Sequence, residues 1–237
     1  TDSKPMSTIS ELFGQIKSDL SQASTLASAN RINKTYLNKN IIDGFKARVH
    51  LYLGEYAEAE ASAAAARAGF SLNGSQYGSG FDDMSTDETM WAMAQTTDQS
   101  NYYYVAPHSF ADHENGAYQG TFINNDFVQL FSDTDVRNTF YHYYSTNTAA
   151  WFAWVTSKFT FAFDSDMIMM RVAEMMLIEA EAKARQGNDA AAATLLFTLQ
   201  SERDPSAVAS GNTGASLIEE VMIERRKEMY CELGVEW

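Results

Sequence analysis

The first seventy residues alternate apolar and polar side chains with the period of amphipathic helices. Thr8-Ile-Ser-Glu11 fits a helix-capping box, in which a hydroxyl and a carboxylate satisfy free backbone N–H groups. Apolar residues then recur at helical spacing at Leu12, Ile16, Leu20 and Ala23. Two further helices are predicted over about residues 41–53 and 56–68, with Gly54 as the break between them. The second of these is rich in alanine, which favours close packing against a neighbouring helix.

The helical period stops between about residues 71 and 165. Gly74, Gly78 and Gly80 punctuate this stretch. Aromatic residues gather in it, namely Tyr102, Tyr103, Tyr104, Phe110, Tyr118, Phe122, Tyr141, Tyr143, Tyr144, Trp151, Phe152 and Trp154. We predict loops with short strands or helices here, for example around residues 88–95 and 124–131.

Helical spacing returns after this insert. Residues 167–186 are apolar on most sides, which predicts a helix packed between others. Gly187-Asn188 ends it, and residues 190–202 are predicted to form its partner. Ser216-Leu-Ile-Glu219 fits a second capping box and predicts a last helix that reaches Cys231.

A faint internal repeat links the two helical regions. The matching positions are Ala47 with Ala180, Gly54 with Gly187, and Ala59 with Ala192. Each set indicates helix, glycine turn and helix, and resembles part of the tetratricopeptide pattern. The sequence therefore predicts a mainly α fold in a single domain over residues 1–237, with a helical hairpin region (7–70), an irregular aromatic-rich insert (71–165) and a C-terminal helical region (166–237).

Composition and charge limit the kinds of partner that the protein can bind. The chain has 237 residues and a formal net charge of −14. An acidic surface is repelled by phosphate, so nucleic acid and anionic membrane surfaces are not expected partners. No apolar run is long enough to cross a membrane, and the one cysteine excludes an internal disulfide. The chain opens without a leader pattern, which leaves open a cytosolic protein and a mature, trimmed one.

Several motifs, in order along the chain, resemble those of the SusD/RagB family. They are the hairpin of residues 46–66, the turn Asp133-x-Asp135-x-Arg137, the helix of residues 171–188, the run Ile223-Glu-Arg-Arg-Lys-Glu-Met229 and the stretch of residues 232–237. The last departs from the family pattern at Glu236, where arginine is usual. Family members are typically about twice as long and carry a lipidated N-terminal cysteine, which this chain lacks, so we expect a fragment.

The resemblance implies a SusD-like fold of tetratricopeptide-like hairpins with an irregular insert that carries the ligand surface. It implies a non-catalytic protein without a cofactor that binds an oligosaccharide or similar nutrient. It also implies a lipid anchor on the outward-facing surface of the outer membrane, and a SusC-type TonB-dependent transporter as partner.

Aromatic residues of the insert are the candidate ligand contacts. Sugars present apolar ring faces that stack on flat side chains, and hydroxyl edges that bond to amides and other polar groups. The candidates are Asn101, Tyr102, Tyr103, Tyr104, His108, Trp151 and Trp154. The alternative interpretation is that these rings form core. Trp91, within an apolar stretch, is expected to be core.

Charged residues on the last helices have a structural interpretation. Arg171, Glu174, Glu181 and Arg185 recur on one predicted helix, and Glu224, Arg225, Arg226 and Glu228 lie on another. A salt-bridge network between the two helices is expected. The histidines show no metal-ligand spacing, and no catalytic motif is present in the sequence. A tetratricopeptide-like adaptor for a protein partner stays open as an alternative function, and a glycoside hydrolase as a remote one.

Overall fold

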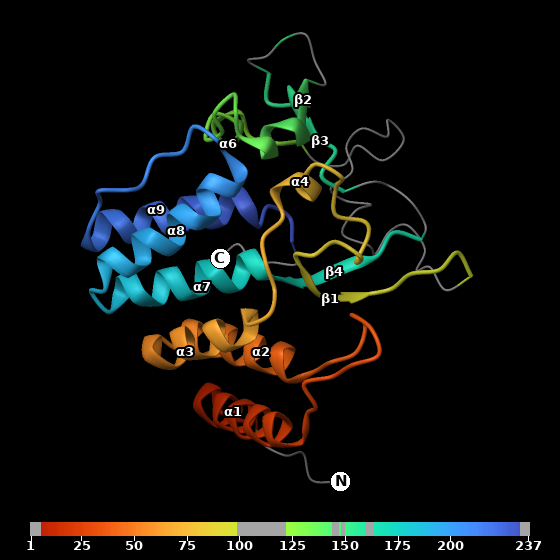
Figure 1. Ribbon diagram of the computed structural model, residues 1–237, viewed down its shortest axis with the longest axis vertical. Coiled ribbons are helices and arrows are strands. Elements are labelled where there is room, and N and C mark those ends of the chain that lie inside the picture. Colours follow the sequence, from red (N-terminus) through yellow and green to blue (C-terminus); the bar gives the residue numbers. More distant parts are fainter. Residues whose placement is uncertain (1–5, 99–121, 144–146, 148–149, 160–163, 233–237) are drawn as a thin grey trace.

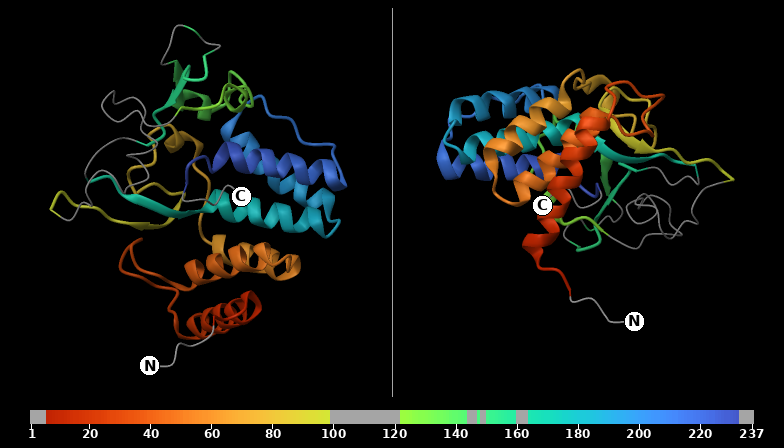
Figure 2. Two further views of the ribbon diagram at one scale, coloured as in Figure 1. Left: turned by 180° about the vertical axis from the view of Figure 1, so that it is seen from behind. Right: turned by 90° about the horizontal axis from the view of Figure 1, so that it is seen from below.

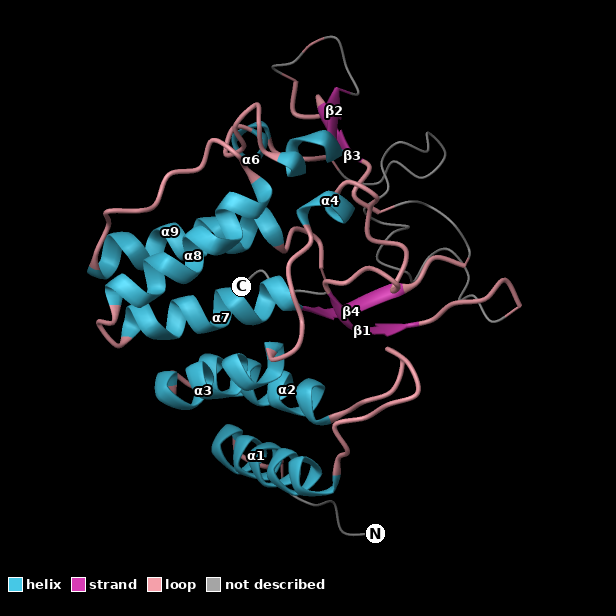
Figure 3. Ribbon diagram, in the orientation of Figure 1, coloured by secondary structure: helices cyan, strands magenta, loops and turns pink. Residues whose placement is uncertain are grey.

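Two helical hairpins that lie far apart in the sequence pack side by side at the centre of the fold (Figure 1). The computed structural model describes residues 6–98, 122–143, 147, 150–159 and 164–232. Its helices are α1 Ile9–Leu26, α2 Lys39–Tyr52, α3 Tyr56–Arg67, α4 Gly74–Tyr77, α6 Asn125–Val128, α7 Val172–Arg185, α8 Asp189–Arg203, α9 Gly214–Glu228 and the 3-10 helix η1 Val136–Phe140. Its strands are β1 Thr89–Met93, β2 Tyr141–Tyr143, β3 Trp154–Thr156 and β4 Met167–Arg171 (Figure 3).

The long helices are stacked in layers, and each layer packs on the next. α1 packs on α2, α2 pairs with α3, α3 packs on α7, and α7 contacts both α8 and α9 (Figures 1 and 2). The hairpin turns are made by Gly54 and Gly187, whose φ angles of 73° and 79° favour a residue without a Cβ. The mainly α fold of helical hairpins is therefore confirmed, and α3 and α7 meet although the insert separates them in sequence. The division of the chain at residues 70 and 165 stays a prediction.

Alanine makes the contact between the hairpins close. Ala59, Ala63 and Ala66 of α3 are fully buried, and they pack in one cluster with Met175, Ile178 and Ala182 of α7. A second core cluster, which includes Leu177, Leu196 and Val221, fills the space between α7, α8 and α9. Trp91 is partly buried against the first cluster and meets Phe45 edge to face.

Short antiparallel strands position the insert. β1 pairs with β4, so that Ala92 lies opposite Ile168 and the chain leaves the pair directly into α7. β2 pairs with β3, with Tyr143 opposite Trp154. In the view of Figures 1 and 3, the β1–β4 ribbon lies at the start of α7, and the β2–β3 ribbon lies near α6, away from α1.

Two predicted helix starts were wrong, while the first capping box is confirmed. Thr8 and Glu11 exchange the two expected hydrogen bonds, at 2.8 and 3.2 Å. Residues 167–186 are not one helix, because residues 167–171 pair with β1 as a strand and helix α7 begins only at Val172. An apolar run of this length does not distinguish strand from helix by its period alone.

The last helix also differs from its prediction at both ends. It begins at Gly214, so Ser216 lies inside the helix and does not cap it. It ends at Glu228, and Cys231 takes a φ of 58° in the turn that follows. The turn brings Glu232 back towards the other helices, which a continued helix would not do.

We expect Ala63→Leu to destabilise the protein by about 1–3 kcal/mol, because the larger side chain overpacks the contact between α3 and α7. Urea denaturation followed by circular dichroism measures the loss. Ala65→Leu is the matched control, since Ala65 lies on the same helix but is exposed. Equal effects of the two substitutions would contradict the close α3–α7 contact.

Candidate ligand-binding site

Exposed aromatic rings gather on the β2–β3 ribbon of the insert. Trp151 is 75% exposed and Tyr143 is 58% exposed, which is unusual for side chains that bury so much area when they are packed. Tyr143 stacks on Trp154 across the ribbon, with 4.0 Å between the ring centroids and 34° between the planes. Phe122 meets Trp151 edge to face at 5.3 Å, while the next residue, Ile123, bridges to the backbone of Trp154. We call Phe122, Tyr143, Trp151 and Trp154 the aromatic platform.

Next to the platform, the insert has a core of its own. Phe127, Phe131, Phe140 and Tyr141 are buried together with Tyr77, Phe81 and Phe159. Tyr230, which follows α9, stacks on Phe127 with 4.7 Å between centroids. The ribbon is therefore packed against this core at Tyr141, while the exposed ring of Tyr143 lies further along the same strand.

Two of the seven sequence-based candidates, Trp151 and Trp154, belong to the aromatic platform. Trp151 lies in the turn before β3, and Trp154 begins β3 with its ring partly covered. Tyr143 and Phe122 were not among the candidates, although they complete the platform. Periodicity could not select them, because the strand pairing that brings Tyr143 over Trp154 is not visible in the sequence. Asn101, Tyr102, Tyr103, Tyr104 and His108 lie outside the described residues.

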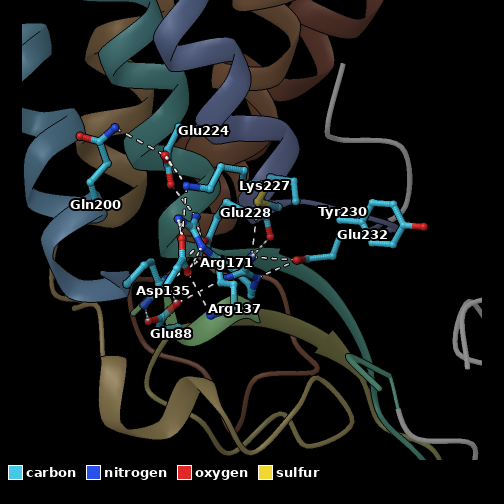
Figure 4. Close-up of polar contacts among 12 residues, drawn as sticks. Glu88, Asp135, Arg137, Arg171, Gln200, Glu224, Lys227, Glu228, Tyr230 and Glu232 are labelled. Atoms are coloured by element: carbon cyan, nitrogen blue, oxygen red, sulfur yellow. Dashed lines mark hydrogen bonds and ion pairs between the residues drawn. The ribbon is translucent and has the colours of Figure 1, made fainter. Parts of the chain in front are cut away.

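A cluster of buried ions joins the insert to the helices (Figure 4). We call it the charge cluster; its members, none more than 5% exposed, are Glu88, Asp135, Arg137, Lys158, Arg171, Arg203, Glu228 and Glu232. Glu228 is fully buried, and its carboxylate accepts hydrogen bonds from Arg137 at 3.1 Å, from Arg171 at 2.9 Å and from Arg203 at 2.9 and 3.1 Å.

The other carboxylates complete the cluster around Glu228. Glu88 accepts two hydrogen bonds from Arg203, at 2.6 and 2.7 Å, which is the paired geometry that a guanidinium favours. Glu232 bonds to Arg171 at 2.7 and 2.8 Å and to the ammonium of Lys158 at 2.6 Å. Glu224 and Lys227 on α9 extend the network by pairing with Arg137 and Asp135, and every cation of the charge cluster faces at least one buried carboxylate.

The surroundings shift the pKa values of these groups. Burial by itself raises the pKa of Glu228, but attraction to Arg203, Arg171 and Arg137 outweighs it and holds the pKa well below its ordinary value of 4.5. Burial also raises the pKa of Glu232, but attraction to Arg171 and Lys158 is stronger, so that this pKa too lies below its ordinary value. Both carboxylates are therefore ionised near neutral pH, as partners of arginine rather than as proton donors.

The expected network between the last helices is confirmed in part. Arg225 on α9 bonds to Glu181 on α7 at 2.7 Å, and Glu181 also pairs with Arg185. Arg171 meets Glu228, but it is the last residue of β4 and not a helix residue. Glu174 turns instead to Arg48 on α2, at 2.6 Å. Glu88, Lys158 and Arg203 were missed, because nothing in their local pattern marks a charge as buried.

Neither a metal site nor a membrane-spanning helix is found in the described part of the chain. There, no group of three or more His, Cys, Asp or Glu side chains is placed to hold a metal ion. Across the same residues, no helix combines the length and apolar character needed to span a bilayer.

Comparison with known proteins gives the family. No protein-family model and no curated protein matched the sequence. Among solved structures, a SusD-like carbohydrate binding protein from Bacteroides vulgatus superposes with a TM-score of 0.84 at 30% identity, covering 97% of this chain and 51% of its own. The chain belongs to the SusD superfamily. It spans about half the length of this relative.

More distant SusD-like folds agree in architecture. A SusD superfamily protein from Bacteroides thetaiotaomicron has a TM-score of 0.85 at 21% identity, covering 97% of this chain and 55% of its own. The surface glycan-binding protein A of Bacteroides uniformis has a TM-score of 0.72 at 15% identity, covering 96% and 56%. These two likenesses bear on the fold, and the resemblance inferred from the sequence motifs is confirmed at the level of the SusD superfamily.

We expect Glu228→Gln to destabilise this SusD-like chain by about 3–5 kcal/mol at neutral pH, because it leaves three buried arginines without their shared anion. Chemical denaturation measures the change in unfolding free energy. Glu219→Gln, at an exposed position on the same helix, should stay within about 0.5 kcal/mol of the wild type. A small effect at Glu228 would mean that the cluster does not depend on it.

Acid should weaken the wild type more than it weakens Glu228→Gln. Because the pKa of Glu228 is lower in the folded state than in the unfolded one, its stabilisation is complete above 4.5 and is lost as the pH falls through the folded pKa. Denaturation curves at about pH 7 and about pH 3 should therefore show the gap between wild type and variant narrowing in acid. A gap that stays constant would show that Glu228 does not titrate as described.

Proposed function

We propose that this chain captures an oligosaccharide without cleaving it, and that the aromatic platform is the binding surface. The observation that carries the proposal is the exposure of Trp151 and Tyr143 beside a ribbon whose inner end, at Tyr141, is packed into an aromatic core. Flat rings offer stacking surfaces for the apolar faces of pyranose rings, at little cost in conformational entropy. The name of the Bacteroides vulgatus relative, a carbohydrate binding protein, supports the same substrate class.

The cellular role follows from the family as part of the proposal. The full-length protein is anchored by a lipid to the outward-facing surface of the outer membrane, and it delivers its glycan to a SusC-type TonB-dependent transporter. Asn101, Tyr102, Tyr103, Tyr104 and His108 remain proposed ligand contacts beside Trp151 and Trp154. No metal or cofactor is required for this mechanism, because stacking and hydrogen bonding alone hold the sugar.

Trp151→Ala should lower the affinity for a bound glycan about tenfold, which corresponds to about 1.4 kcal/mol and to the loss of one stacked ring. Isothermal titration calorimetry against maltoheptaose, cellohexaose, xylohexaose and yeast α-mannan measures it. Tyr52→Ala is the matched control: Tyr52 is 77% exposed but lies on α2, in a different layer of the molecule (Figure 1).

Either of two results would count against the platform. The first is an unchanged affinity in Trp151→Ala; the second is an equal loss in Tyr52→Ala. Bond cleavage, seen as new reducing ends during the titration, would point instead to a glycoside hydrolase.

A second candidate function, an adaptor for a protein partner, is favoured by a groove among the first helices. The groove has a volume of about 390 Å³ and is lined by residues of α1, α2 and α3, including Lys17, Leu20, Lys46, His50 and Ser62. Grooves between elements are one kind of surface that binds peptide segments. If phage-displayed peptides bind wild type but not Ser62→Trp, and none of the four glycans binds, the adaptor function is the better account.

A further inference from the structure

Both strands of the platform ribbon lead into the charge cluster at their inner ends. Arg137 lies in η1, the helix that runs directly into β2, and Lys158 follows closely after β3. Between them, Tyr141 pairs with Thr156, and the N–H of Ser157 donates to the carbonyl of Phe140 at 2.8 Å. The outer end of the same ribbon carries Tyr143 and Trp154. The ribbon is therefore an arm with rings at one end and buried cations at the other.

Lys158 is fixed by three acceptors that all come from one short segment. Its ammonium, 1% exposed, donates to the backbone carbonyls of Glu228 and Tyr230 at 3.0 Å each, and to the carboxylate of Glu232 at 2.6 Å. A lysine has three donors, so all of them are used. Its ammonium also lies 4.7 Å from the centroid of the Phe81 ring.

Arg137 holds the other strand, with carboxylate partners on Asp135, Glu224 and Glu228. It donates to both oxygens of Asp135, at 2.9 and 2.8 Å, and to Glu228 at 3.1 Å. The backbone N–H of Arg137 also donates to Asp135, which caps η1. Each strand of the ribbon thus has its own buried cation, and both cations contact the segment of residues 228–232.

From this arrangement we infer that Lys158, together with Arg137, is a positioning residue that sets the orientation of the aromatic platform. The side chains of Lys158 and Arg137 are at most 2% exposed, so they act through the ribbon and do not touch a glycan themselves. The consequence for affinity rests on the proposed glycan function, whereas the consequence for the rings does not. A glycan that needs the platform rings in one relative arrangement will bind more weakly when the inner end of the ribbon is released.

The test follows the rings directly. The protein is labelled with fluorotryptophan, and the fluorine resonances of its four tryptophans, Trp91, Trp151, Trp154 and Trp237, are assigned by single Trp→Phe substitutions. Lys158→Met should shift or broaden the resonances of Trp151 and Trp154 and leave Trp91, on β1, in place. Lys158→Arg, which keeps the charge, should restore the wild-type positions. Should Lys158→Met fail to fold, Glu232→Gln removes the negative charge that pairs with Lys158 and gives the same readout.

Arg225→Met is the matched control. Arg225 is 3% exposed and forms a buried ion pair of 2.7 Å with Glu181, but the pair joins α9 to α7 and not to the ribbon. It should lower the melting temperature as Lys158→Met does, and leave all platform resonances unchanged. Equal shifts in both variants, or none in Lys158→Met or Glu232→Gln, would overturn the inference, because the cation would then contribute to stability alone.

The glycan arm separates the two proposals. If one of the four glycans binds wild type, Lys158→Met should weaken that glycan by about threefold to tenfold while Arg225→Met leaves it within about twofold. If no glycan binds wild type while the resonances shift as expected, the positioning role holds and the glycan function fails. If a glycan binds and its affinity and the resonances are the same in wild type and Lys158→Met, the glycan function holds and the positioning role fails.

Discussion

A single buried carboxylate, that of Glu228, holds together parts of the chain that are otherwise unrelated. Three guanidinium groups converge on it from η1, from the end of β4 and from the end of α8. Isolated in an apolar interior, any one of these ions would cost several kcal/mol. Together they satisfy one another, and the directional hydrogen bonds of arginine allow few other arrangements. The insert therefore has a defined place on the helical layers.

The cluster also explains how the short strands in the described part of the insert keep their place. Its ribbons are short, and pairs of such short strands are marginal by themselves. Here the aromatic core supplies burial, while the ions at the inner end supply direction. Asp204, at the end of α8, adds a further tie by accepting hydrogen bonds from Ser132 and Thr134, both at 2.6 Å. The exposed rings are thus carried on an anchored ribbon.

The sequence predicted the helical part of this molecule well, because helix caps, turns and buried faces depend on residues that are close together in the sequence. Capping at Thr8, the glycine turns at Gly54 and Gly187, and the alanine face of α3 were all readable from neighbouring residues. The strand Met167–Arg171 was not, because it becomes a strand only by pairing with β1, far away in the chain. The family motifs were informative, and they carried the fold further than periodicity did.

The site was less predictable, for a different physical reason. Trp151 and Trp154 were candidates as aromatic residues, but exposure distinguishes a binding surface from a core, and exposure is a tertiary property. The buried ions were hidden in the same way. In the sequence, Arg203 resembles an ordinary basic residue at a helix end, and Lys158 resembles a solvated loop residue. Their partners Glu88 and Glu232 lie 115 and 74 residues away in the chain.

Those long separations bear on the order in which the protein folds. Hairpin α2–α3 joins neighbouring residues and can form as soon as it has been synthesised, whereas contacts between distant residues form slowly. The charge cluster needs Glu228 and Glu232, which leave the ribosome after every other member. Until then its arginines and lysine lack two of the carboxylates that fix the inner end of the ribbon on the helices. The surface that holds the exposed rings is therefore expected to be the last part of the molecule to take shape.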